Sequence, residues 1–157
     1  MARKAFEFLD HMADVYIAAY GRDLKEAFEN AAKAMFEVMT DISTVNSKVK
    51  REIRVEGFDL ESLLYEWLEE LLFIFEVELI VFSEFRVKRI ERVNGKYVLE
   101  AEVFGEKFDP SKHPRKTGVK AVTYSLMEIV DKPGAVSYTH LRAHETRHDL
   151  VCRLLLE

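Results

Sequence analysis

The sequence has 157 residues, of which 48% are hydrophobic and 32% charged, with a formal net charge of −5 and a single cysteine. This length predicts one domain whose core is large enough to fold without disulfides or a structural metal. The acidic balance excludes a chain that coats nucleic acid through bulk positive charge. No hydrophobic run reaches the length of a membrane span, and the first residues, MARKAFEF, lack the hydrophobic region of a signal peptide. Together with the near-absence of cysteine, these features predict a cytoplasmic protein.

Two short strands and a helix are predicted in the first forty residues. The strand candidates, residues 6–9 and 15–20, lie on either side of a polar insert at residues 10–14. Asp23 is placed to cap the helix that follows, with Glu26 three residues later as in a capping box. Apolar residues then recur at helical spacing, which predicts one buried helix face: Leu24, Ala27, Phe28, Ala31, Met35 and Val38.

A half-buried strand and a longer helix are predicted next. Residues 49–55 alternate apolar and charged side chains after a loop at residues 41–47, and Gly57 ends the strand. Asp59 is placed to cap the second helix. Every charged residue from 57 to 84 is acidic, so the outer helix face is either a solvated surface or a docking surface for a basic partner. Its acids are Glu61, Glu66, Glu69 and Glu70, and its buried face is predicted to be Leu60, Leu63, Leu64, Trp67, Leu68, Leu71, Leu72 and Phe75.

Three further strands complete the pattern. Residues 80–93 and 96–104 are joined at Asn94-Gly95, a dipeptide that suits the positive φ values of a type I′ hairpin turn. A polar loop at residues 111–117 leads to a strand at residues 119–130. The order β-β-α-β-α-β-β-β lacks βαβ regularity. It predicts an α+β two-layer sandwich, in which a mixed, mostly antiparallel sheet carries two main helices on one face.

The last residues of the chain differ in character from the rest. They include His144-Glu145-Thr146-Arg147-His148, the H-E-x-x-H pattern in which two His bind zinc and the Glu acts as a base, and His140 adds a third imidazole. We reject a metallopeptidase hypothesis because this segment back-translates, in one frame, into a DNA-sequencing adapter and its usual continuation. We therefore predict a domain at residues 1–134 and a non-native tail at residues 135–157. The alternative is a basic amphipathic C-terminal helix.

Within residues 1–134, one short segment could carry chemistry. There is no glycine-rich phosphate loop, no nucleophile elbow and no cysteine. The exception is the polar insert, Asp10-His11-Met12-Ala13-Asp14, where two carboxylates and an imidazole crowd between strands. Carboxylates suit a hard cation such as Mg²⁺ or Ca²⁺, and a His tolerates a softer one. The alternative is a turn in which the Asp side chains bond to backbone N–H groups. His113, in the polar loop, is predicted to be a surface residue.

The same insert begins a resemblance to a known family. Residues 8–15 (FLDHMADV), closed by residues 19–21 (AYG), resemble the opening motif of the archease family, usually H-T-A-D-[IV], with Met12 where the motif usually has Thr. The resemblance covers residues 5–130 and implies an archease-like fold for the domain at residues 1–134. Further blocks match in the same order at residues 24–41, 63–73, 82–85, 105–113 and 119–124.

This resemblance implies an accessory role rather than an enzyme. Archeases are small cytosolic partners of the RtcB-type RNA ligase, which rejoins tRNA halves. They promote guanylylation of the ligase and its multiple turnover, and they meet tRNA only through the ligase. The resemblance also implies a divalent cation (Ca²⁺, Mg²⁺ or Mn²⁺) held by Asp14, with Asp10 and His11 as shaping groups. The remaining ligands come, in the family, from a final strand that ends in an Asp and an aliphatic residue.

The predicted tail bears directly on that metal site. Because residues 135–157 stand where the family's final strand is expected, we expect the sheet to lose an edge strand and the cation to lose its C-terminal ligands. Two other functions remain open on the sequence. One is a stand-alone metal-dependent hydrolase that uses His11, Asp10 and Asp14, and the other is a metal-free acidic module that binds proteins through its second helix.

Overall fold

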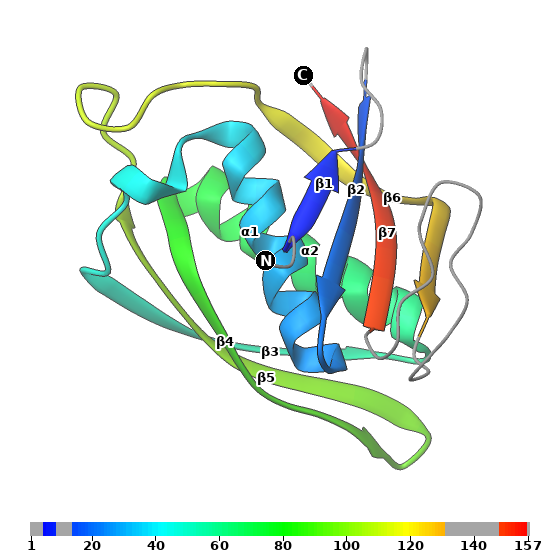
Figure 1. Cartoon of the computed structure of the whole chain (residues 1–157). Helices are drawn as coiled ribbons and strands as arrows, with labels where there is room; N and C mark the ends of the chain where they lie inside the picture. The colour runs from blue at the N-terminus through cyan, green and yellow to red at the C-terminus, as the bar shows by residue number, and fades with distance from the viewer. Residues whose placement is uncertain (1–4, 9–13, 131–147, 157) are drawn as a thin grey trace.

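The structure is a computed structural model that describes residues 5–8, 14–130 and 148–156. The described strands form two antiparallel sheets, with the orders β1-β2-β7-β6 and β3-β5-β4 (Figure 1). The predicted α+β class with two main helices is confirmed, although the sequence did not predict the division into two sheets. In chain order the elements are β1 (Phe6–Phe8), β2 (Asp14–Gly21), α1 (Leu24–Met39), a 3-10 turn η1 (Ile42–Thr44), β3 (Val49–Gly57), α2 (Leu60–Glu78), β4 (Ile80–Val93), β5 (Lys96–Lys107), β6 (Val119–Val130) and β7 (His148–Leu156).

Both helices begin at the predicted caps. The Asp23 side chain accepts the backbone N–H of Glu26 at 2.9 Å, and the Glu26 carboxylate accepts the N–H of Arg22 at 2.7 Å. In a regular capping box the Glu26 side chain would accept the N–H of the cap residue, Asp23. Here it accepts the N–H of Arg22, one residue earlier. At α2 the box is complete, because Asp59 accepts the N–H of Ser62 at 2.7 Å and the Ser62 hydroxyl accepts the N–H of Asp59 at 3.1 Å. These bonds satisfy N–H groups that a helix start otherwise leaves without partners.

The predicted hairpin between β4 and β5 is also confirmed. Asn94 and Gly95 have φ values of 52° and 81°, and Val93 pairs with Lys96 across the turn. Positive φ at both central residues is the requirement of a type I′ turn, whose twist matches that of the flanking strands.

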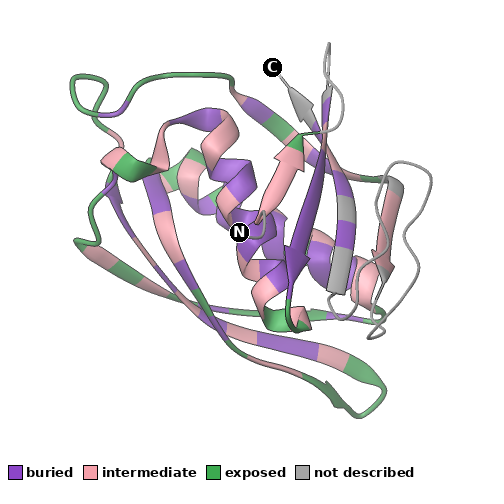
Figure 2. Ribbon diagram, viewed as in Figure 1, coloured by how far each residue is buried: buried purple, intermediate pink, exposed green. Residues whose placement is uncertain are grey.

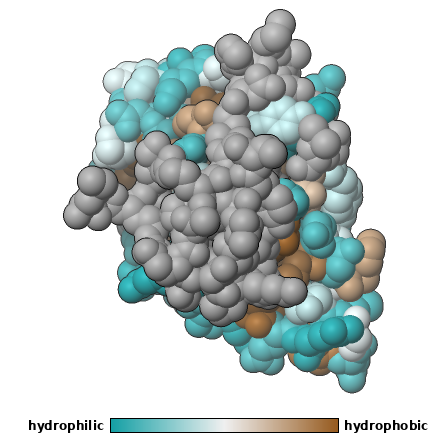
Figure 3. Space-filling model, turned by 45° about the vertical axis from the view of Figure 1, so that its right-hand side comes forward, coloured by the Kyte–Doolittle hydropathy of each residue, from teal (hydrophilic) through white to brown (hydrophobic). Residues whose placement is uncertain are grey.

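The core lies between the two sheets, where the helices pack. α1 packs against β2 and β4, while α2 packs against β3 and β6. The Trp67 indole N–H donates to the Phe28 carbonyl at 2.9 Å and so joins the two helices inside the core. Buried residues concentrate on the helices and on the strand faces turned toward them (Figure 2). On the face in Figure 3, the described surface is mostly hydrophilic, with small hydrophobic areas between.

The C-terminal part of the chain departs from expectation. β7 lies between β2 and β6, so residues 148–156 fill the middle of the four-stranded sheet. The expectation that the sheet loses an edge strand is wrong, and so is a C-terminal helix over these residues. The physical reason is alternation at period two, because Leu150, Cys152 and Leu154 are buried while Arg153 between them is half-buried.

Other expectations for the tail are not decided by the structure. Residues 131–147 lie outside the described part, and with them most of the H-E-x-x-H pattern, including His140, His144 and Glu145. Its last residue, His148, begins a strand rather than continuing the helix that a zinc-binding pattern of this kind needs. The boundary between a domain at residues 1–134 and a non-native tail at residues 135–157 stays a prediction.

Candidate functional site

Asp14 is the first residue of β2, at one end of the four-stranded sheet. In the β2–β7 register it lies opposite Leu155, and Leu156 in turn pairs with Val119 at the start of β6. The start of β2, the end of β7 and the start of β6 therefore meet at this end of the sheet, which is uppermost in Figure 1. Asp10 and His11, the other two candidates of the insert, lie outside the described residues.

The described residues at this end do not make a complete cation site. β7 ends in Leu154-Leu155-Leu156, and its acid, Asp149, pairs with Tyr20 near the other end of β2. At about 3.4 Å per residue, that separation from Asp14 is roughly 20 Å. Across residues 5–8, 14–130 and 148–156, no three His, Cys, Asp or Glu side chains gather where they could hold a metal. Because hard cations take six or more oxygen ligands, partly from water, the described donors do not fit the implied ion.

A buried polar cluster organises the loop that leads into β6. Its centre is the Glu106 carboxylate, whose side chain is 8% exposed. One carboxylate oxygen, Oε2, accepts three bonds: from the backbone N–H of Asn46 at 2.8 Å, the Lys112 ammonium at 2.7 Å and His113 Nε2 at 2.9 Å. These donors, the Asn46 N–H first, lower the pKa of Glu106 to about 2.

His113 is the ring that closes this cluster. Its Nδ1 accepts the backbone N–H of Asp109 at 2.9 Å, so the ring proton sits on Nε2 and is donated to Glu106. The prediction of a surface residue is wrong, because His113 is fully buried. The reason is a tight turn in which the His113 N–H donates to the Asp109 carbonyl at 2.7 Å and folds the ring back onto the end of β5. Glu106 seven residues earlier was the available signal, since a buried His needs an acceptor.

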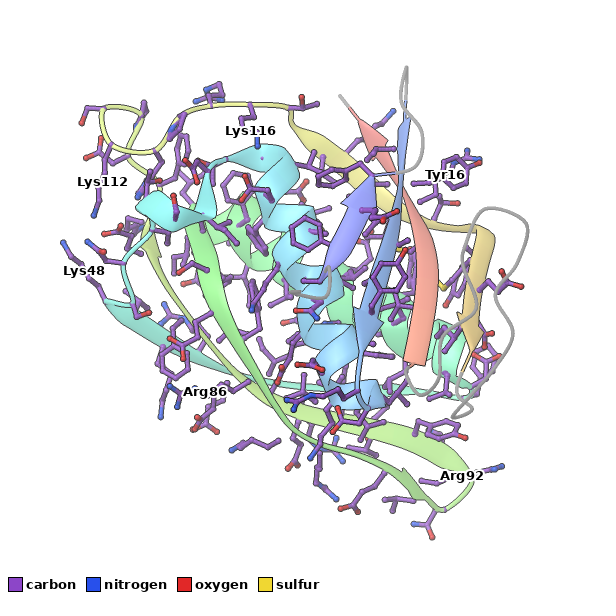
Figure 4. All side chains as sticks on the ribbon, viewed as in Figure 1. Tyr16, Lys48, Arg86, Arg92, Lys112 and Lys116 are labelled. Carbon is purple, nitrogen blue, oxygen red and sulfur yellow. The ribbon has the colours of Figure 1, made fainter. Side chains whose placement is uncertain are left out.

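The cluster fixes the loop rather than forming a catalytic arrangement. Lys48 adds a second cation 3.6 Å from Glu106 Oε1, and Figure 4 shows Lys48 and Lys112 at the same edge of the molecule. All the polar groups at Glu106 and His113 have partners inside the protein. Burial raises the pKa of the Cys152 thiol to about 12, so this cysteine is not a nucleophile at neutral pH.

A cavity of about 610 Å³ opens beside the same loop. It is lined by the ends of α1 and α2, by Val81 and by loop residues from Phe108 to Val119, among them Arg115. The Arg115 guanidinium lies over the Phe108 ring, 5.3 Å from its centroid. Leu79, in the left-handed conformation with φ of 58°, borders the opening. The cavity is mainly apolar, and its charged lining residues are Glu76, Arg115 and Lys116. Lys116 pairs with Glu37 at 3.1 Å.

The acidic residues of α2 differ in whether they take part in the fold. Glu69 is half-buried, and its carboxylate accepts the backbone N–H of Val122 at 2.8 Å, which ties α2 to β6. Glu66 and Glu70 are exposed, and Glu61 is half-buried. The sequence grouped these acids because their spacing is helical, but it could not show that one of them is used inside the fold. Of the helices in the described part, none has the length and hydrophobicity that crossing a membrane requires.

Comparisons with known proteins agree with the resemblance seen in the sequence. Residues 6–141 match the family described as "Archease protein family (MTH1598/TM1083)". The chain is 54% identical over 127 residues to "Protein archease" of Sulfurisphaera tokodaii, covering 81% of this chain and 89% of that protein. It is 48% identical over 130 residues to the protein of the same name from Pyrococcus furiosus, covering 83% and 91%. It is also similar to the solution structure of Methanobacterium thermoautotrophicum protein 1598, with a TM-score of 0.75, 42% identity and 98% of each chain covered.

Proposed function

The chain belongs to the archease family, and from this premise we propose that it is an accessory protein of an RtcB-type RNA ligase in tRNA splicing. In this role it is not itself an enzyme. It promotes guanylylation of the ligase and its multiple turnover in the cytoplasm, and it meets tRNA only through the ligase. The observation that carries the proposal is the family match over residues 6–141. It is supported by sequence identities of 54% and 50% to two proteins named archease, each over most of the chain.

A divalent cation is part of this proposal only in a limited way. Such an ion, Ca²⁺, Mg²⁺ or Mn²⁺, would neutralise and order phosphate charge when bound. We propose that Asp14 is one ligand and that Asp10 and His11 shape its surroundings. Because β7 presents leucines where further carboxylates are needed, we expect this chain to bind divalent cations weakly.

The chain's own residues support the proposed role by fixing the loop that leads into β6. The Glu106–His113 cluster secures the loop before β6 against β5. The backbone N–H groups of Lys116 and Thr117 donate to the carbonyls of Met39 and Val38, so the same loop is also fastened to the end of α1. A loop fastened at both points would present the same surface to the ligase in every encounter.

The direct test is a time course of guanylylation. An RtcB-type ligase is incubated with GTP, with and without this protein, and the covalent guanylate is measured. We expect a faster reaction and more turnovers per ligase when the protein is present, but only a small increase, because this chain is expected to bind the cation weakly. An unchanged time course, with a ligase that is active alone, would overturn the proposal.

A metal-free interaction module is the second candidate, and the exposed acids Glu66 and Glu70 on α2 favour it. It differs from the first in one respect, since Asp14→Ala would then leave ligase activation intact. A stand-alone metal-dependent hydrolase is tested in parallel by incubating the protein alone with a phosphoester and Mn²⁺. Turnover under those conditions would replace the accessory role with an enzymatic one.

A further inference from the structure

The outer face of α2 combines acidic and apolar side chains in one stripe. Glu66, Glu70, Phe73 and Val77 follow the spacing i, i+4, i+7, i+11, so they lie along one side of the helix, and we call them the α2 stripe. Phe73 is 57% exposed and Val77 is 62% exposed. The opposite side of the helix supplies Trp67 and several fully buried leucines to the core. More than half of each residue of this apolar pair is therefore left uncovered by the fold.

The two acids of the stripe do not make the intramolecular bonds that neighbouring acids make. Glu69 bonds to the backbone of β6, and Glu78 pairs with Arg51 at 2.7 Å. Within the described residues, the carboxylates of Glu66 and Glu70 make neither an ion pair nor a hydrogen bond. No Lys, Arg or His occurs between residues 57 and 84, so no cation of α2 itself offsets this charge.

A second element brings aromatic surface beside the stripe. Tyr124 of β6 stacks on Tyr65 of α2, with ring centroids 4.4 Å apart and planes inclined by 14°, and Tyr124 is 48% exposed. Burial, and then the negative charge of Glu66, raises the pKa of Tyr124. Glu66 thus lies near this stacked pair, in which Tyr124 is exposed and Tyr65 is half-buried. Aromatic faces next to a carboxylate attract Lys and Arg side chains through both charge and the ring quadrupole.

We propose that the α2 stripe, together with Tyr124, is a docking surface for a basic amphipathic segment of a partner protein. Apolar side chains of the segment pack against Phe73 and Val77, while its Lys or Arg side chains meet Glu66, Glu70 and Tyr124. The stripe thus places charge toward the start of α2 and exposed apolar surface toward its end, which matches a segment that carries both basic and apolar side chains. The inference rests on the proposed function in one respect, since it takes the RtcB-type ligase as the protein that carries the segment.

Two double variants test this surface by measuring the affinity of the full chain for the ligase. Phe73→Ser with Val77→Ser should weaken binding by about tenfold or more, because truncated central apolar contacts are the costly ones. Glu66→Lys with Glu70→Lys should weaken binding at low salt and remove most of its salt dependence. Phe58→Ser is the matched apolar control, since Phe58 is 76% exposed but precedes α2, and Glu52→Lys on β3 is the charge control. Both controls should bind as the unaltered chain does.

The outcomes separate this inference from the proposed function. If the ligase binds and neither double variant differs from its control, the docking surface is overturned while the accessory role stands. If the unaltered chain neither binds nor activates the ligase, the accessory role fails. The surface is then decided with a synthetic helical peptide of Leu and Lys in amphipathic order. That peptide should bind the unaltered chain and lose binding in both double variants, and equal binding to all of them would overturn the surface.

Discussion

The two sheets of this molecule differ in how their strands are brought together. β3, β4 and β5 come from one continuous stretch of chain, and a two-residue turn joins two of them. In the other sheet β7, from the end of the chain, pairs with β2, from its beginning. Local sequence signals are enough to predict the strands of the first sheet. The central position of the second sheet requires only a strand whose apolar residues alternate at period two. β7 therefore completes the packing of its sheet, while its described residues nearest to Asp14 in the pairing are leucines rather than acids.

Removing β7 should have the largest effect on stability. This change is the most severe test of the difference between the two sheets. Truncation before His148 takes three buried side chains, Leu150, Cys152 and Leu154, out of the core. At about 1.5–3 kcal/mol for a fully buried apolar side chain, the loss is several kcal/mol, a large part of a typical stability. Urea unfolding measures it, and hydrogen exchange should show that β2 and β6 lose more protection than β4 and β5. An unchanged unfolding midpoint would mean that residues 148–156 do not hold the sheet together.

Glu106→Gln should have the next largest effect, and the effect should depend on pH. The folded pKa of about 2 lies below the ordinary value of 4.5, so the ionised carboxylate contributes stability above pH 4.5. That contribution, about 3 kcal/mol at 1.36 kcal/mol per unit, is lost as pH falls from 4.5 through 2. The variant should therefore be less stable at pH 7 by up to this amount, and the difference should shrink toward pH 2. Thermal unfolding at pH 7, 4 and 2.5 checks this, and a difference that does not vary with pH would contradict it.

Gly95→Ala should lower the free energy of unfolding by a smaller amount. It acts on the three-stranded sheet formed by β3, β4 and β5. Gly95 has φ of 81°, and no atom would meet an added Cβ within 4 Å, so the cost is backbone strain alone. We expect a loss of about 1–2 kcal/mol in the free energy of unfolding. Gly95→Asn is the matched control, because Asn tolerates this conformation better and should cost less. Equal losses for Ala and Asn would argue against the type I′ turn.

Asp14→Ala should have the smallest effect on stability, within about 0.5 kcal/mol, because the sequence places Asp14 at the boundary of a polar insert. If the proposed function holds, the same variant should activate the ligase poorly, because it removes one proposed cation ligand. Unfolding and guanylylation are measured on the same preparation. A folded variant with full activation would remove Asp14 from the site and favour the metal-free module.

Local chemistry made most of the fold readable from the sequence. The Asp23 and Asp59 caps, the Asn94-Gly95 turn and the buried faces of both helices depend on residues within a few positions of one another. His113 was not readable in this way, because its burial depends on a turn that returns its ring to the end of the preceding strand. The strand at residues 148–156 was not predicted either, because the H-E-x-x-H pattern at residues 144–148 is typical of a helix.

The candidate site could be predicted from the sequence only in part, because the residues that meet there depend on the register of strand pairing. The sequence placed Asp14 at the end of the polar insert, just before a strand at residues 15–20, whereas the structure makes it the first residue of β2. Which residue lies across from it is set by the pairing of distant strands, and one residue of slippage would present a different side chain. Glu69 illustrates the same limit on α2, since only the structure shows that it bonds to β6.

The most direct test of the claim that β7 completes the sheet but not the cation site is a metal titration of Leu155→Asp. Directly opposite residues in an antiparallel pair share one face, so this change adds a carboxylate beside Asp14. Leu156→Asp is the control, because it adds the same charge on the other face at the same end. With Mn²⁺ or Ca²⁺ followed by calorimetry, we expect weak binding by the unaltered chain and at least tenfold tighter binding by Leu155→Asp, lost again when Asp14→Ala is added. Tight binding by the unaltered chain, or equal affinities for Leu155→Asp and Leu156→Asp, would contradict this account.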